Sequence, residues 1–370
     1  MIGAFDKTFN EIRKNKDVKD NGGFNSIPFG ITSLDKFVPG IMKGTMYKVT
    51  ASSGVGKTQI AKHLFVNQPY RFVKANPHLR IKLKIFYFAL EESQTEFMAT
   101  LICNRLQEVY GIRITPLALK SMGSYHLDDT VYEKVILCRE YFRELEQAIE
   151  IVDYISNPFG MYKYVRDYAR ANGRFYFKGV EVNPEVPGTM YDTYTANDPN
   201  EWVIVVSDHI SLLQAEQKDT LFLAMQKWSA EYCRKQITKH FNYAVANIQQ
   251  QAADKERLEF TNTGQSIETK LEPSLDGLGD CKVTGRDDMV IMGLFAPDRY
   301  EIEKHLGYDI GLLKDNYRSL SILKNRYGPP NVKIPLYFDG GTNTFKQLPE
   351  VGTEELGRIY NNFKQGVRDF

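Results

Sequence analysis

Ala51-Ser52-Ser53-Gly54-Val55-Gly56-Lys57-Thr58 is the stretch of sequence that decides the fold. The apolar run 46–50 precedes it, and the helical pattern 59–66 follows it. A strand, a loop of small residues, Lys-Thr and a helix, in that order, are typical of a phosphate-binding loop. Small residues let backbone N–H groups curl around a phosphate, and the helix N-terminus adds its positive dipole end. The sequence therefore predicts a nucleotide cradle that consists of Ser53, Gly54, Val55, Gly56, Lys57 and Thr58.

Two side chains of this loop have distinct expected roles. Lys57 would reach the β- and γ-phosphates of ATP, and Thr58 would place its hydroxyl on Mg²⁺. The first position of the motif, usually Gly, is Ala51 here. Because Ala is small, we expect the turn to form provided that Ala51 holds a negative φ.

The composition is that of an ordinary globular protein. Of the 370 residues, 42% are apolar and 25% are charged, and the net charge is 47 − 46 = +1. No global field therefore indicates a polyanionic partner, although local charges can still bind one. The four cysteines form no C-x-x-C pair, which indicates thiols in a reducing compartment. Without a signal-peptide pattern or an apolar run of ~18 residues, we expect a cytoplasmic protein with no membrane contact.

Three further apolar runs are followed by polar side chains that suit catalysis. They are 81–89, 202–208 and 241–248, and we predict that each is a strand. Glu91 and Gln249 follow the first and third runs, and Asp208 ends the second. The carboxyl ends of parallel strands meet at one edge of a sheet. We therefore expect Asp208 to hold Mg²⁺ and Glu91 to polarise water, with a solvated acid pair at a helix start as the alternative for Glu91. Gln249 would sense the γ-phosphate or, alternatively, would be a plain polar strand end.

Strands that alternate with helical patterns predict an α/β fold with its site along one strand edge. We expect one helix over 220–240, strands near 289–295 and 320–327, and a C-terminal hairpin over 336–345. Residues 115–150 look largely helical. In that segment one apolar stripe is expected from Val131, Val135, Cys138, Phe142, Leu145 and Ile149.

The expected organisation is an N-terminal helix or arm over 1–23, one large domain over 24–350, and a tail over 351–370. Within the large domain, residues 157–200 are dense in Tyr, Phe, Gly and Pro and form an insertion. Its aromatic and basic residues would bind single-stranded nucleic acid or, alternatively, would pack on themselves as a small subdomain.

The N-terminal helix also has two interpretations. Phe5, Phe9 and Ile12 share one face of a helix over 1–20. That face packs either on its own domain or on a neighbouring subunit.

The loop after Gln249, about 252–285, is long and polar, as functional loops often are. Its basic residues include Lys255, Arg257 and Lys270, which are candidates for contact with a DNA backbone. Acidic residues lie among them, so a merely solvated loop is the alternative.

Five segments, taken in order, resemble the RecA-like motor domain of DnaB-type replicative helicases, a hexameric family that includes phage helicases. The resemblance covers about residues 25–350. The last segment is similar to the family's Lys-x-Arg-x-Gly-Pro element. The five segments are Gly30-Ile31-Thr32-Ser33-Leu34-Asp35, Phe88-Ala89-Leu90-Glu91-Glu92-Ser93, Val205-Val206-Ser207-Asp208, Val245-Ala246-Asn247-Ile248-Gln249 and Leu323-Lys324-Asn325-Arg326-Tyr327-Gly328-Pro329.

The resemblance implies ATP hydrolysis with Mg²⁺ in a homo-oligomeric, hexameric ring that travels 5′ to 3′ on single-stranded DNA and unwinds forked duplex DNA. It puts water activation on Glu91 and γ-phosphate sensing on Gln249. In the family, the two cations of the last segment reach the neighbouring subunit's γ-phosphate, which implies that role for Lys324 and Arg326. It also relates residues 1–23 to the family's linker helix, and it makes primase or a helicase loader a candidate partner.

Two other functions fit the same motifs. A RecA/RadA-like recombinase, or a clock-type ATPase of the RecA fold, would use this motor in a filament or signalling ring without unwinding DNA. A non-catalytic, nucleotide-gated scaffold would not need both Glu91 and Asp208. Because both residues are present, the scaffold is disfavoured.

Overall fold

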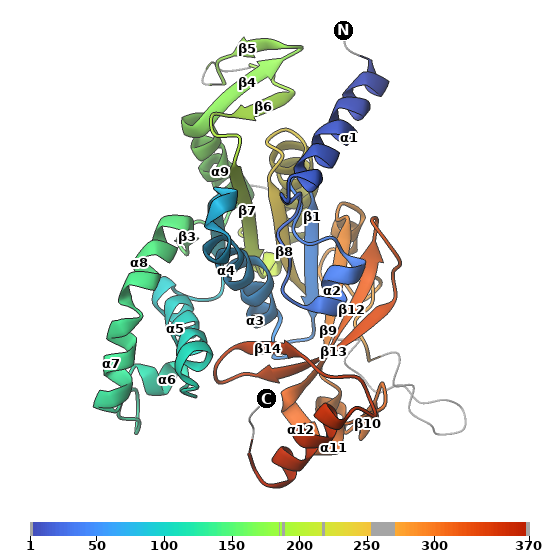
Figure 1. Cartoon of the computed structure of the whole chain (residues 1–370). Coiled ribbons are helices and arrows are strands. Elements are labelled where there is room, and N and C mark those ends of the chain that lie inside the picture. Colours follow the sequence, from blue (N-terminus) through green and yellow to red (C-terminus); the bar gives the residue numbers. More distant parts are fainter. Residues whose placement is uncertain (1–2, 185, 187–188, 217–218, 253–270, 368–370) are drawn as a thin grey trace.

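A nine-stranded sheet forms the centre of the protein (Figure 1). The computed structural model describes residues 3–184, 186, 189–216, 219–252 and 271–367. Within these residues the strand order is β14-β13-β12-β9-β1-β8-β7-β2-β3. The strands from β9 to β3 in that order pair in parallel, whereas β12, β13 and β14 are antiparallel. The α/β class, the mostly parallel sheet and the C-terminal hairpin are thus confirmed.

The strands and helices have the following bounds. The strands of the large sheet are β1 Met46–Ala51, β2 Lys82–Ala89, β3 Ile149–Val152, β7 Glu201–Asp208, β8 Ala244–Gln250, β9 Val290–Phe295, β12 Tyr317–Asn325, β13 Val332–Asp339 and β14 Thr344–Gln347. The remaining strands are β4 Gly173–Phe177, β5 Val180–Val182, β6 Thr193–Ala196, β10 Lys304–His305 and β11 Tyr308–Asp309. The α-helices are α1 Ala4–Asp20, α2 Thr32–Phe37, α3 Lys57–Lys62, α4 Gln68–Ala75, α5 Gln94–Tyr110, α6 Pro116–Leu119, α7 Asp129–Leu137, α8 Arg139–Ala148, α9 Pro158–Asn172, α10 Leu221–Gln226, α11 Ile310–Leu313 and α12 Glu354–Lys364. The π-helices are η1 His63–Asn67 and η4 Lys227–Thr238, and the 3₁₀ turns include η3 Ile210–Leu212, η7 Lys282–Arg286 and η8 Pro297–Tyr300.

Helices cover both faces of the sheet and bury two separate cores. On one face, α3 and η1 pack Ile60 and Phe65 against β1. On the other face, α9 and η4 pack Val165 and Trp228 against the sheet. All eight residues of β7 are buried, and its side chains enter the two cores alternately. This explains why the sequence of a central parallel strand is an almost unbroken apolar run.

The single apolar stripe expected over 131–149 is divided in the structure. Cys138 caps the end of α7 and the start of α8, so two helices carry the stripe. Ile149 belongs to β3, which pairs in parallel with β2 at the edge of the sheet. The run Ile149-Glu150-Ile151-Val152 is rich in β-branched residues, which favour a strand once a neighbouring strand is available.

The helix expected over 220–240 is α10 followed by the π-helix η4, and the next strand begins at Ala244 rather than at 241. Phe241 instead packs with the aromatic residues of the insertion.

The insertion packs on itself and on the sheet. Its strands β4, β5 and β6 form a separate three-stranded antiparallel sheet. Phe175 and Tyr194 are buried against Phe241. Three of its arginines are ion-paired: Arg166 and Arg170 with Asp167, and Arg174 with Glu181. The aromatic rings therefore fill a core, which favours the subdomain over a platform for stacked bases.

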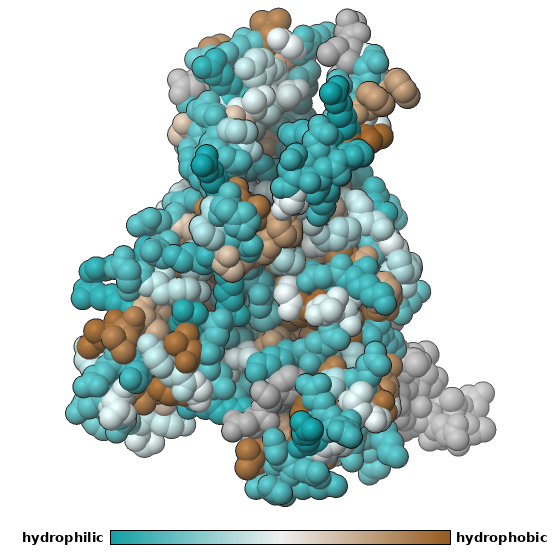
Figure 2. All heavy atoms as spheres, in the orientation of Figure 1, coloured by the Kyte–Doolittle hydropathy of each residue, from teal (hydrophilic) through white to brown (hydrophobic). Residues whose placement is uncertain are grey.

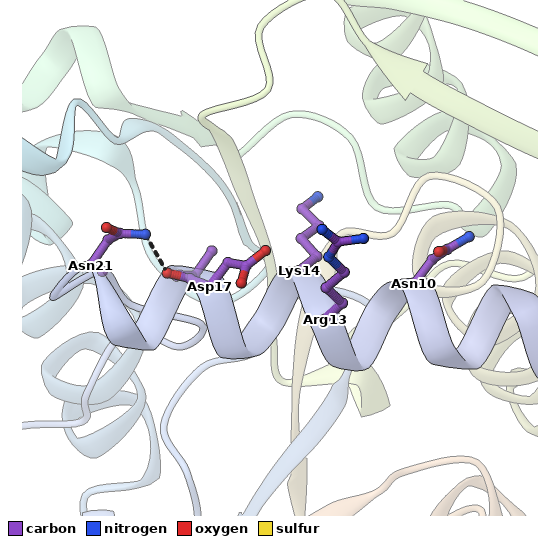
Figure 3. A pocket seen from close by; sticks show the side chains of 7 residues that line it. Asn10, Arg13, Lys14, Asp17 and Asn21 are labelled. Carbon is purple, nitrogen blue, oxygen red and sulfur yellow. Dashed lines mark hydrogen bonds between the residues drawn. The ribbon is translucent and has the colours of Figure 1, made fainter.

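The helix predicted near the N-terminus is present as α1, at the same end of the molecule as the insertion sheet (Figure 1). Its polar side lines an open groove that includes Asn10, Arg13, Lys14 and Asp17 (Figure 3). At the other terminus, α12 buries Leu356 in a small third core. Among the described residues, no helix has both the length and the apolar character needed to cross a bilayer.

Candidate nucleotide-binding site

The loop between β1 and α3 has the shape that phosphate binding requires. Ala51 ends β1 without a positive φ, so it is tolerated in place of the usual Gly. Gly54 and Gly56 have φ of +69° and +108°, where a side chain would be strained. A Cβ at Gly56 would also lie 3.4 Å from the ring of Phe338. The loop and the start of α3 line a cavity of about 400 Å³, which also contacts Glu91, Glu92 and Asp208.

Two arginines hold the loop from outside. Arg318 is almost fully buried in β12, and its Nε donates to the carbonyl of Val55 at 2.7 Å. Arg299 donates to the carbonyl of Ser53. These contacts turn peptide carbonyls toward the arginines, an arrangement that leaves amide N–H groups for an anion. Sequence analysis missed both residues; the available signal was the cation Arg318 at the start of a strand whose first six residues are all buried.

Asp208 and Thr58 meet beside this loop. Asp208 ends β7 in register with the end of β2. Thr58 Oγ1 donates to Asp208 Oδ1 at 3.1 Å, and Tyr87 OH donates to Oδ2 at 2.9 Å. Burial raises the pKa of Asp208 to about 6, because its charge is removed from water. A buried carboxylate beside a hydroxyl, at the wall of a phosphate-sized cavity, is a donor set that fits Mg²⁺.

Asp208→Asn is expected to stabilise the nucleotide-free protein by about 1–3 kcal/mol, from a shift of about two pKa units. With a pKa of 3.8 unfolded and about 6 folded, the folded chain binds more protons between these pH values. Stability therefore falls as pH rises through this window and stays lower above it. Thermal unfolding at about pH 7.5 should show a higher Tm for the variant. It should also show a smaller rise in Tm on adding Mg·ADP. A Tm at or below that of the wild type would contradict the expectation.

Two adjacent acids, Glu91 and Glu92, line the cavity, and they differ in their partners. Lys62 is buried and pairs with Glu92 at 2.6 Å, so the second acid is held by a cation. The Glu91 side chain is 54% exposed, and its Oε2 lies 3.1 Å from Nδ1 of His209. Burial lowers the pKa of His209. The expected placement of a carboxylate beside the phosphate-binding loop is therefore found at Glu91.

Gln249 lies in a buried polar network under the sheet. Its Oε1 accepts from Lys48 Nζ at 2.8 Å and from Thr284 Oγ1 at 2.7 Å, and its Nε2 donates to the carbonyl of Gly279. Lys48 also pairs with Asp288 at 3.3 Å, and both side chains are fully buried. We call Lys48, Asp288, Gln249 and Thr284 the Lys48 network.

The Lys48 network changes what can be expected of Gln249. It occupies the face of β8 opposite α3, so a contact with a γ-phosphate would require Gln249 to leave the network. Side chains alternate along a strand. The next residue, Gln250, is in register with Ala51 and is therefore on the face that α3 covers.

Arg326 lies at the far end of the sheet from its own phosphate-binding loop. Its backbone N–H donates to the carbonyl of Met289. The N–H of Met289 in turn donates to the carbonyl of Met46, where β1 begins. Five strand steps separate Met46 from Ala51, about 16 Å at 3.3 Å a step. The Arg326 side chain is exposed. It is thus too far to serve the loop of its own subunit.

Lys324, unlike Arg326, contacts backbone carbonyl groups of its own subunit. It is partly buried, and its Nζ donates to the carbonyls of Gly285 at 2.8 Å and Arg286 at 3.3 Å. Burial lowers its pKa. In this structure Lys324 therefore contacts its own subunit, and of the two expected cations Arg326 is the one that faces solvent.

No protein-family profile matches this sequence, and no curated protein matches it. Solved structures do match. The ATPase domain of G40P superposes with a TM-score of 0.68 at 18% identity, over 94% of this chain and 100% of that one. A DnaB-like replicative helicase, described with its interactions with primase, superposes with a TM-score of 0.65 at 18% identity, over 91% and 67%. The fold is the RecA-like fold of replicative-helicase ATPase domains.

In this replicative-helicase fold the segment after β8 holds the remaining predicted site residues. Lys255, Arg257 and Lys270 lie outside the described residues. Beyond residue 270, the N–H of Ser274 donates to Gln251 Oε1 at 3.3 Å, and Gln251 in turn donates to Thr50 Oγ1 at 2.8 Å. The end of this segment is therefore anchored on β1 and β8, the strands that carry the phosphate-binding loop and the Lys48 network.

Proposed function

We propose that this protein is an ATP-dependent DNA helicase motor that works as a homo-oligomeric, hexameric ring on single-stranded DNA in the cytoplasm. One observation carries the proposal. Each chain has the phosphate-binding loop and Asp208 at one end of its sheet and an exposed Arg326 at the other end, about 16 Å away along the strand direction. Copies arranged head to tail would bring the arginine of one to the cradle of the next.

Each residue of the cradle has one task in the proposed reaction. Lys57 contacts the β- and γ-phosphates, and Thr58 with Asp208 holds Mg²⁺, which when bound neutralises phosphate charge. Glu91 orients the attacking water for in-line displacement. Gln250, from the α3 face of β8, is better placed than Gln249 to contact the γ-phosphate. Gln249, which is held in the Lys48 network, then relays the presence of the γ-phosphate to the loop that follows β8.

The neighbouring subunit supplies the remaining charge. Arg326 stabilises the transition state in trans, and Lys324 would assist only after leaving Gly285 and Arg286. The loop that carries Lys255, Arg257 and Lys270 is proposed to grip DNA phosphates, with 5′ to 3′ travel and a primase or loader as candidate partner.

Exposed apolar surfaces support self-association. On α1, Phe5, Phe9 and Ile12 are 78%, 56% and 60% exposed, and the two rings stack on each other. A second group of hydrophobic side chains gathers over α6 and α7 (Figure 2), with Leu117, Ile136 and Leu137 among them. Apolar patches of this kind on a soluble chain mark sites of association.

Phe9→Glu is expected to weaken the oligomer by at least about tenfold in Kd, since burying one aromatic ring contributes about 1.5–3 kcal/mol. Asn10→Glu, which adds the same charge on the polar side of α1, is the control (Figure 3). Light scattering with Mg²⁺ and a non-hydrolysable ATP analogue would measure both. Equal effects of the two variants would show that α1 does not dock through its apolar face.

The experiment that tests the function is strand displacement on forked DNA with ATP. A helicase releases the displaced strand and prefers a fork with a 5′ tail. ATPase activity stimulated by single-stranded DNA without displacement would favour the recombinase or another RecA-fold ATPase. Nucleotide binding without turnover would favour the scaffold.

A further inference from the structure

His209 follows Asp208 directly and has an unusual backbone conformation. Its φ of 62° and ψ of 65° lie in the left-handed region, which costs a residue with a Cβ about 1 kcal/mol. This turn comes at the end of β7, in register with the end of β2, from which Glu91 follows two residues later. The ring, 12% exposed, lies with Nδ1 3.1 Å from Oε2 of Glu91.

The chemistry of the two groups defines the contact. An ionised carboxylate can only accept hydrogen bonds, so Nδ1 of His209 must carry the proton that it shares with Glu91. The contact occupies one carboxylate oxygen and leaves the other to accept from a water molecule. Glu91 otherwise stands half in solvent on a flexible stem, and holding such a side chain costs up to about 2 kcal/mol of rotamer entropy.

We propose that His209 is a positioning residue that holds the Glu91 carboxylate in the orientation from which it directs the attacking water. This inference rests on the proposed function, because it takes Glu91 as the water-orienting group. The next acid does not share the arrangement, since Glu92 is held by Lys62 at 2.6 Å. His209 thus gives Glu91 a separate, rigid support from the strand end that also carries Asp208.

Two substitutions separate the hydrogen bond from the backbone turn. Asn and Gly both accept a positive φ. Asn carries an N–H donor where His has Nδ1, whereas Gly carries none. For the full-length protein, His209→Gly is expected to lower kcat for ATP about 10- to 100-fold, since small misplacements of catalytic groups have effects of this size. His209→Asn should recover most of that loss. The affinity for a fluorescent ATP analogue should change less than about threefold in both, because neither variant removes a group that is proposed to contact the phosphates or Mg²⁺.

The double variant His209→Gly/Glu91→Gln completes the test. If His209 acts through Glu91, the double variant is no slower than Glu91→Gln alone. Wild-type kcat in His209→Gly, or equal losses in the Gly and Asn variants, would overturn the inference. His209→Ala provides the same comparison with Asn if the glycine protein does not fold. Wild-type turnover in Glu91→Gln would instead refute the proposed role of Glu91, so the two failures are distinguishable.

Discussion

Arg326→Ala is expected to lower kcat for ATP hydrolysis by about 10³–10⁵-fold, the usual effect of removing an arginine that neutralises transition-state charge. ATP binding to the same subunit should change little, because Arg326 lies about 16 Å of strand away from that subunit's own loop. Steady-state ATPase assays and titration with a fluorescent nucleotide measure the two quantities.

Mixing variants shows whether the arginine acts between subunits. Arg326→Ala subunits keep an intact cradle, and Lys57→Ala subunits keep an intact Arg326. Neither protein should hydrolyse ATP alone, but a mixture forms interfaces that combine the two intact halves, so activity should partly return. Arg358→Ala is the control, since this arginine is 78% exposed on α12. Two inactive proteins that stay inactive when mixed into one oligomer would exclude shared sites.

Glu91→Gln is expected to lower kcat by about 10²–10⁴-fold, the range that a positioned acid–base group contributes. Glutamine has nearly the same size and can still accept a hydrogen bond, but it cannot take a proton. ATP and Mg²⁺ should still bind, so the variant should accumulate with ATP rather than ADP in the site. Rapid-quench analysis of the bound nucleotide measures this directly.

Glu92→Gln is the matched control for that experiment. Glu92 pairs with buried Lys62, so its replacement removes an ion pair and should lower Tm while leaving kcat within about tenfold. If Glu92→Gln stops turnover and Glu91→Gln does not, the two acids have exchanged roles relative to the proposal.

The phosphate-binding loop and the strands that frame it could be predicted from sequence because their signals are local. Gly54 and Gly56 mark backbone positions that only Gly holds without strain, and Asp208 follows an apolar strand whose end must lie at the sheet edge. The prediction for Gln249 depended on which face of β8 this side chain occupies, and the sequence does not specify that face. Side chains alternate between the two faces of a strand, so an error of one residue moves a group from one face of the sheet to the other.

Other features depend on tertiary partners. Arg318 reaches Val55 across 263 positions of sequence, and nothing local announces that contact. Ile149 continues a helical stripe in the sequence, yet the free edge of β2 recruits it into a strand. Lys324 and Arg326 are two residues apart, and only the position of the η7 carbonyl groups beside β12 distinguishes the bound lysine from the exposed arginine.

The cradle follows β1 and Arg326 follows β12, and β9 joins these two strands in one continuous hydrogen-bonded sheet. Such a sheet resists bending along its strands, so each copy would behave as a stiff spacer of constant length. Successive nucleotides in an assembly would then repeat at an interval that the polypeptide itself dictates. Any stepping motion would have to arise at the joints between copies, and cross-links that lock one joint should stall the whole ring.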